Sequence, residues 1–160
     1  MSEQNQTPSD AVLVTVGGPV DELSVSLGIY GEDLDPSDVT TRLGVEPTKS
    51  FRRGYRAGPR SPELPHGAWL LSVRTANHAD PGAAVGTLLS KLTADKDVWR
   101  QLNSQFSVQL RIAVHMEGWN KGFRIDAGSA AQLAIIGAEL IFDIYAYGEE
   151  KEKVSESTGG

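Results

Sequence analysis

Residues 106–117 read FSVQLRIAVHME, and this stretch decides the fold class. Apolar residues occupy every second position from Phe106 to Met116, while polar residues or alanine fill the positions between them. Successive side chains of a β-strand point to opposite faces of its sheet, so the pattern predicts a long strand with one buried face. Residues 24–30 and 140–145 repeat the alternation, and residues 69–74 predict a shorter, less regular strand. Such strands are typical of antiparallel or mixed sheets that are covered on one face.

Helices are indicated by the residues at their ends. An Asp-Pro pair, which caps and opens a helix, occurs at residues 35–36 and again at residues 80–81. The first helix stops at Gly44, and the second is expected to restart at Asp95 or Asp97 and to carry Trp99 into the core. A last helix is expected over about residues 129–136, before Gly137.

The order of these elements predicts a topology. Residues 48–67 would be unusually long for a structureless connection, so we expect a strand over residues 49–55 that turns back into the strand at Trp69. The succession is then strand, helix, strand, strand, helix, strand, which is ferredoxin-like, followed by an extra C-terminal helix and strand. The predicted fold class is therefore α+β, with a largely antiparallel (mixed) sheet and helices on one face. Residues 11–16 are expected to pair with the first strand as an edge.

Length and composition set the broad class. The 160 residues fit one domain, which we place at residues 11–148, with disordered segments at residues 1–10 and in the acidic tail 149–160. The chain lacks cysteine, an apolar run of membrane-spanning length and a secretory signal pattern, so we expect a cytoplasmic protein without membrane contact. The net charge of −6 disfavours a general binder of polyanions.

Several short motifs together resemble a known family. They are GEDLDP at residues 31–36, LGVEP at 43–47, a basic loop with glycines, Trp69 on a strand, and FDIY at 142–145. The chain looks like the small bacterial proteins grouped as domain of unknown function 4279, over about residues 24–147. The resemblance implies a bacterial protein and a stand-alone domain. It implies no activity, so it brings no catalytic or cofactor-binding residue with it.

The residues themselves offer little for catalysis. His115 and Glu117 lie two apart on the polar face of the long strand, where they could share a proton or bind a metal ion. Two ligands are too few for a metal site. The presence of His115 and Glu117 is explained equally well by a sheet face that is exposed to solvent. We expect no catalytic residue, no metal and no cofactor. A small hydrolytic or ligand-binding enzyme that uses the polar sheet face stays an alternative.

The segment at residues 49–60, KSFRRGYRAGPR, departs from the acidic average. It holds five of the fifteen cationic residues, and removing their charge from the net −6 leaves −11 for the remainder. Arginine binds carboxylates and phosphates through paired hydrogen bonds, and aromatic residues add stacking surfaces. The segment is therefore a protein-binding loop, a nucleic-acid site, or a loop whose arginines pair with acids of its own domain or of another subunit. Its candidate binding residues are Arg52, Arg53, Tyr55, Arg56 and Arg60.

The polar face of the sheet is a second candidate surface if the helices cover only the other face. Its candidate binding residues are Arg111, His115 and Tyr145, with Trp119 in the loop that follows the long strand. Tyr30, Arg74, Glu117 and Asp143 are expected on the same face. Pairing of Arg111 with Asp143 across the strands is the simpler explanation for two of these residues.

The sequence thus favours a non-catalytic binding module over an enzyme. The expected ligand is a protein partner, in an immunity-type or accessory role, bound through the Arg-rich loop and the open sheet face. Single-stranded nucleic-acid binding is a third possibility. It is disfavoured because the acidic remainder would repel phosphates beyond a Debye length of about 8 Å from the basic loop.

Overall fold

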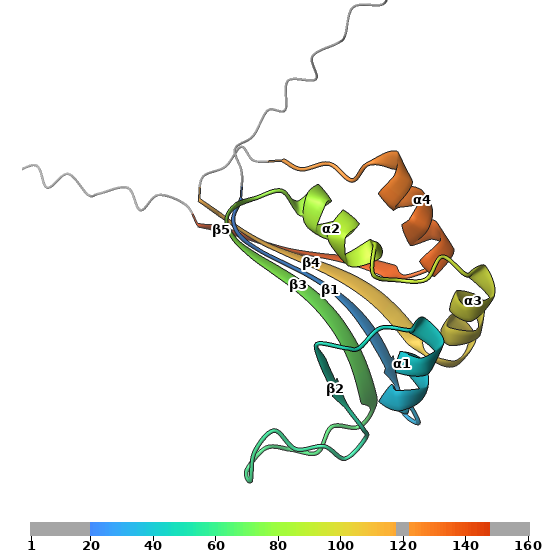
Figure 1. Cartoon of the computed structure of the whole chain (residues 1–160). Helices are drawn as coiled ribbons and strands as arrows, with labels where there is room; N and C mark the ends of the chain where they lie inside the picture. The colour runs from blue at the N-terminus through green and yellow to red at the C-terminus, as the bar shows by residue number, and fades with distance from the viewer. Residues whose placement is uncertain (1–19, 118–121, 148–160) are drawn as a thin grey trace, which may run out of the picture.

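A computed structural model describes residues 20–117 and 122–147 (Figure 1). In chain order, the described elements are β1 (Val20–Gly31), α1 (Pro36–Leu43), β2 (Lys49–Phe51), β3 (Gly67–Ala79), α2 (Pro81–Leu89), α3 (Lys96–Gln105), β4 (Ser107–Glu117), α4 (Ala127–Ile136) and β5 (Glu139–Tyr147).

The strands form one five-stranded sheet in the order β2-β3-β1-β4-β5. Neighbouring strands are antiparallel except β4 and β5, which are parallel and are joined through α4. The register brings the apolar positions of neighbouring strands together: Val25 of β1 lies opposite Val73 of β3 and Ile112 of β4. The prediction of an α+β fold with a largely antiparallel, mixed sheet is confirmed.

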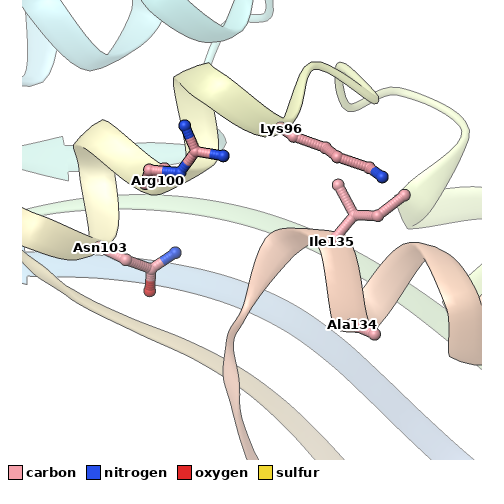
Figure 2. Close-up of a pocket in the computed structure, with 5 residues that line it drawn as sticks. All are labelled: Lys96, Arg100, Asn103, Ala134 and Ile135. Atoms are coloured by element: carbon pink, nitrogen blue, oxygen red, sulfur yellow. The ribbon is translucent and has the colours of Figure 1, made fainter.

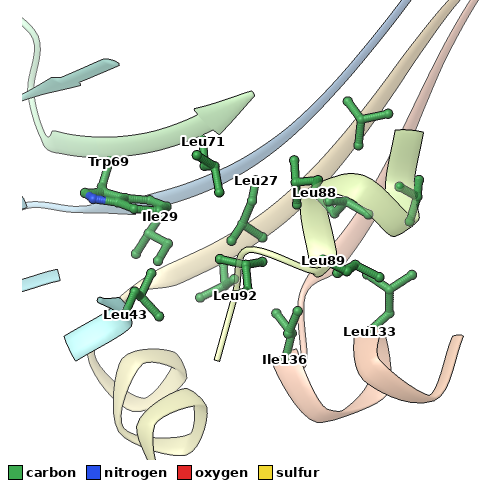
Figure 3. Close-up of a cluster of buried hydrophobic side chains, with 14 of the residues drawn as sticks. Leu27, Ile29, Leu43, Trp69, Leu71, Leu88, Leu89, Leu92, Leu133 and Ile136 are labelled. Atoms are coloured by element: carbon green, nitrogen blue, oxygen red, sulfur yellow. The ribbon is translucent and has the colours of Figure 1, made fainter. Parts of the chain in front are cut away.

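All four described helices lie on the same face of this sheet (Figure 1). The hydrophobic core fills the space between the helices and that face, as the close-up of buried side chains shows (Figure 3). The strands contribute fully buried residues such as Leu27, Ile29 and Trp69, and Leu88 and Ile136 are equally buried on the helices. The opposite face of the sheet carries no helix of the described chain.

The helices begin where their caps predict. Each described helix has an aspartate N-cap whose carboxylate accepts a hydrogen bond from a backbone N–H two or three residues further on; these caps are Asp35, Asp80, Asp95 and Asp126. The last helix starts earlier than expected because Asp126 caps it.

Two separate helices, α2 and α3, join β3 to β4. The ferredoxin-like detail therefore stays a prediction.

Strand β2 is shorter than the expected strand over residues 49–55. It ends at Phe51, and Gly54 then adopts a φ of +86°, which an extended strand does not allow. The backbone N–H of Gly54 donates to the carbonyl of Leu64, and the N–H of Leu64 donates to the carbonyl of Tyr55. The connection from β2 to β3 is therefore a loop closed by its own hydrogen bonds.

Strand β5 has the predicted alternation but not the expected burial. Leu140, Phe142 and Ile144 pair in register with the buried Leu110, Ile112 and Val114 of β4, yet about half of each side chain is exposed. The side chains are exposed because β5 is the edge strand of the sheet.

Residues 11–16 were expected to pair with the first strand, and they lie outside the described residues. Over Glu22–Tyr30, β1 already pairs with β3 on one side and with β4 on the other.

Candidate binding surface

The Arg-rich loop between β2 and β3 makes ion pairs within the chain. Arg52 donates to Asp35 at 2.7 Å, Arg53 donates to Glu32, and Arg56 donates to Glu63 at 2.8 Å. All six side chains are more than a third exposed, so solvent screens each pair and its contribution to stability is small.

Asp35 has two tasks in this arrangement. Its carboxylate accepts the backbone N–H of Ser37 at 2.9 Å, which caps α1, and it also accepts the guanidinium of Arg52. The backbone hydrogen bond from Ser37 lowers the pKa of Asp35, and the hydrogen bond and positive charge of Arg52 lower it further. The helix cap therefore holds an ionised partner in place for the loop.

The loop leaves two of its predicted site residues exposed to solvent. Tyr55 stacks on Phe51 with ring centroids 5.6 Å apart, and 45% of Tyr55 is still exposed. Arg60 is exposed, and no acidic side chain of the described residues lies within ion-pair distance of it. The loop therefore offers one aromatic ring and one arginine, while its other three arginines are already paired.

The uncovered face of the sheet contains a shallow hollow of about 550 Å³. The lining residues come from β1, β3, β4 and β5: Glu22, Ser24, Arg74, Arg111, Ala113, His115, Asp143 and Tyr145. The strand register explains the grouping, because Ser24 lies opposite both Arg74 and Ala113, and Ala113 lies opposite Asp143. The structure thus brings together three residues of the predicted site, Arg111, His115 and Tyr145.

Arg111 and Asp143 form a cross-strand pair on this face. The guanidinium of Arg111 donates to the carboxylate of Asp143. This hydrogen bond and the negative charge of Asp143 raise the pKa of Arg111, which is held as a cation. The pairing holds the guanidinium on the open face beside the edge strand β5 and neutralises part of its charge.

His115 lies between Glu22 of β1 and Tyr145 of β5 in the register of the sheet. The rings of His115 and Tyr145 are stacked, with centroids 4.6 Å apart and an angle of 11° between their planes. The two rings therefore form one aromatic stack in the lining of the hollow. The side chain of Glu117 lies outside the described residues, as does all of Trp119, so the proposed His115–Glu117 pair and the Trp119 anchor stay predictions.

Arg74 differs from Arg111 in its surroundings. Its side chain is exposed, and among the described residues no carboxylate lies within ion-pair distance of it. Sequence reasoning placed Arg74 on this face but did not count it among the binding residues, and it missed Glu22 entirely. Glu22 precedes the regular alternation of β1, and its position opposite His115 became visible only with the strand register.

A second hollow, of about 370 Å³, lies between α3 and α4 (Figure 2). Lys96, Arg100 and Asn103 line it from α3, and Ala134 and Ile135 line it from α4. Two of its three polar side chains, Arg100 and Asn103, already have partners within the fold. Arg100 pairs with Asp97 at 2.7 Å, and the amide of Asn103 donates to the carbonyls of Trp99 and Ile136. The open sheet face is therefore the stronger candidate site.

In residues 20–117 and 122–147, no three side chains of the metal-binding types lie close enough to hold a metal ion. No helix in that part of the chain is long and apolar enough to cross a membrane.

These observations define a class of protein: an α+β domain whose mixed sheet is covered by helices on one face and open on the other. Residues 21–147 match the family model described as domain of unknown function (DUF4279), and the chain belongs to this family. The family prediction is confirmed. No curated protein and no solved structure matches the chain.

Proposed function

We propose that this domain is a non-catalytic binding module that recognises a protein partner on the open face of its sheet. The observation that carries the proposal is the hollow on that face, lined by Arg74, Arg111, His115 and Tyr145. Arginine and tyrosine are enriched among the residues that dominate binding energy at protein interfaces. Here they come from three strands, β3, β4 and β5, and lie on one face of the sheet.

The rigidity of the strands supports this role. The lining side chains project from β1, β3, β4 and β5, which are hydrogen-bonded to one another along most of their length. Arg111 is held by Asp143, and the ring of His115 is held against Tyr145. A surface whose side chains are already ordered loses less conformational entropy on binding than a mobile loop does.

The charges on this face indicate what the partner presents. Arg111 is satisfied by Asp143, whereas Arg74 is exposed without a carboxylate of the described residues nearby. A partner that places an Asp or Glu side chain against Arg74 would form a charge-assisted hydrogen bond there. The stacked rings of His115 and Tyr145 would contact a neighbouring apolar or planar group of the same partner.

The Arg-rich loop takes a lesser part in this proposal. Arg52, Arg53 and Arg56 would have to exchange their present carboxylate partners for new ones, with little net gain. Tyr55 and Arg60 are exposed and would contact a partner that extends beyond the sheet. An immunity-type or accessory role is the specific form of the proposal, with the partner being the protein that is blocked or assisted.

The test is affinity capture from a lysate of the source cells, with the wild-type chain and three variants as bait. Arg74→Glu replaces the positive charge at this position by a negative one, which would repel a carboxylate of the partner, and should abolish capture. Arg100→Glu, on α3 at the helix-covered side, is the matched control and should leave capture unchanged. The triple replacement of Arg52, Arg53 and Arg56 by Ala should weaken capture slightly. A partner retained by Arg74→Glu but lost with the triple variant would move the site from the sheet face to the loop.

A further inference from the structure

Strand β5 forms one edge of the sheet, and its outer side pairs with no strand of residues 20–117 and 122–147. Its residues on the helix side, Leu140, Phe142 and Ile144, are 45, 47 and 56% exposed. With Tyr145, β5 carries four of the five large apolar or aromatic residues that are exposed in the described chain. Neighbouring exposed apolar side chains of this kind mark an interaction surface.

The two outer strands of the sheet differ in how they are protected. Natural proteins guard free edges with short strands, lysine, proline or bulges. Strand β2 has three residues and begins with Lys49. Strand β5 has nine residues, ELIFDIYAY, without lysine, proline or glycine. Of its two acids, Asp143 is paired with Arg111, and Glu139 at the first position accepts a hydrogen bond from Gln109, so the middle of β5 carries no unpaired charge that would guard the edge.

The helix beside this edge extends the apolar surface. Helix α4, with the sequence AGSAAQLAII, contains no charged residue. A hollow of about 500 Å³ lies between it and the start of β5, with Ile125, Leu133, Ala134 and Leu140 among the lining residues. The free strand, the uncharged helix and this apolar hollow form one continuous surface, which water solvates poorly.

We propose that this surface binds a second copy of the same chain, with β5 pairing antiparallel to β5 of the second copy around a two-fold axis. Edge-to-edge pairing satisfies the free backbone groups of both strands. A two-fold axis makes the interface self-complementary and closed, so association stops at the dimer. The net charge of −6 opposes it little at the centre of the strand, because Asp143 is paired with Arg111 and the charged Glu139 lies at the start of β5.

The register of the paired strands follows from their side chains. Residues directly opposite each other in an antiparallel pair share a face, so the apolar faces coincide only when the two residue numbers have an even sum. Centring the axis on Asp143 places two carboxylates opposite each other, and centring it on Ile141 places Glu139 opposite Asp143. Centring it on Phe142 avoids both clashes of like charge and pairs Leu140 with Ile144 of the second copy. Centring it on Leu140 or on Ile144 also avoids both clashes, but it leaves Ile144 or Leu140, respectively, opposite no residue of β5. The dimer is therefore centred on Phe142, where all three exposed apolar residues of the helix side are paired.

This register connects the dimer to the open sheet face. The two sheets join into one of ten strands, with both sets of helices on the same side. Tyr145, which lines the hollow on the open face, lies opposite Glu139 of the second copy. The second copy thus adds a carboxylate at the rim of each hollow.

The test is the mass of the chain in solution, measured by light scattering after gel filtration at about 1 and about 100 µM. We expect twice the chain mass at the higher concentration. Phe142→Lys places two lysines opposite each other at the axis, and it should weaken dimerisation by at least about 30-fold. Tyr55→Lys changes a residue of similar exposure far from β5 and is the matched control. Circular dichroism establishes that each variant is folded.

Hydrogen exchange of the wild-type chain gives a readout that needs no variant. The backbone N–H groups of β5 should exchange more slowly at the higher concentration, while those of β2 should be unaffected. A chain that stays monomeric at both concentrations overturns the proposal. Residues 11–16 or another protein would then be the alternative partners of β5. A dimer that Phe142→Lys leaves intact, or whose β5 exchanges at one rate at both concentrations, overturns it as well.

Discussion

Gly82 shows how closely two segments approach each other at the scale of one residue. It lies at the start of α2, where its N–H donates to the cap Asp80 at 3.0 Å. A Cβ atom at this position would lie 2.2 Å from the carbonyl oxygen of Arg124, in the segment that leads into α4. Because the obstacle is backbone, the clash cannot be relieved by turning a side chain. The absence of a side chain at Gly82 therefore allows the start of α2 to pack against residues 122–126.

Gly82→Ala should destabilise the fold by about 1–3 kcal/mol, because one of the two backbone segments must move. Gly86→Ala is the matched control in the same helix, since the nearest atom to its added Cβ would be the hydroxyl of Ser129 at 3.9 Å. The control should stabilise the protein by up to about 1 kcal/mol, because alanine favours the helix over glycine. Urea denaturation measures both changes in the free energy of unfolding. Equal effects of the two replacements would show that the contact at Gly82 is not tight.

At the scale of elements, Asn103 joins two helices. Its side-chain amide donates to the carbonyl of Trp99 within α3 and to the carbonyl of Ile136 at the end of α4, at 2.9 and 2.7 Å. The last carbonyls of a helix lack partners within that helix, so Asn103 satisfies one of them. Next to it, Gly137 ends α4 with a φ of +68°. One side chain therefore fixes where α3 lies against the end of α4.

Asn103→Ala should lower the free energy of unfolding by about 0.5–1.5 kcal/mol, the net value of a hydrogen bond that water can partly replace. Asn103→Asp should cost more, because its carboxylate faces two carbonyl oxygens and has no N–H to donate. Ser104→Ala, which removes a hydrogen bond to Gln101 within the same helix, is the control and should have a smaller effect. If Asn103→Asp were as stable as the wild type in urea, the side chain would not bridge the two helices.

The sequence predicts elements well where the signal is local. Alternation defined β4 to within a residue, and the caps Asp35 and Asp80 located the starts of α1 and α2, because each cap acts on a backbone N–H two residues away. It predicts less well where the outcome depends on position in the sheet. The alternation of Leu140, Phe142 and Ile144 indicates which face they share, but it does not show that β5 is an edge.

The same distinction holds for the candidate site: positions along one strand could be predicted, and contacts between distant segments could not. Arg111, His115 and Tyr145 could be assigned to one face from their spacing along two strands. The carboxylates that pair with Arg52 and Arg53 could not be identified, because they lie 17 and 21 residues away in the sequence. Glu22 became part of the hollow only through the register of β1 against β4. Contacts across strands are decided by the global arrangement, which single-sequence patterns do not contain.

At the scale of the whole molecule, both proposed surfaces follow from the placement of the described helices on one face of the sheet. The apolar positions of β1, β3 and β4 are in phase, so the large buried side chains of these strands point to the face that the four helices cover. The opposite face is left to polar and aromatic residues, where the hollow forms. Because the helices cover the centre of the sheet more completely than β5, its apolar residues stay exposed at the edge. The open face and the free edge are therefore two results of one arrangement.

The core of the described chain lies between Leu23 and Ile136, which leads to a prediction about the ends of the protein. A shortened chain of residues 20–147 keeps every buried side chain of the described core and all five strands. Its free energy of unfolding should match that of the full chain within about 0.5 kcal/mol, the usual range for changes away from buried features. Urea denaturation followed by tryptophan fluorescence measures this, because Trp69 and Trp99 are fully buried. A loss of several kcal/mol would contradict this prediction, and removing residues 1–19 and residues 148–160 separately would show which end is responsible.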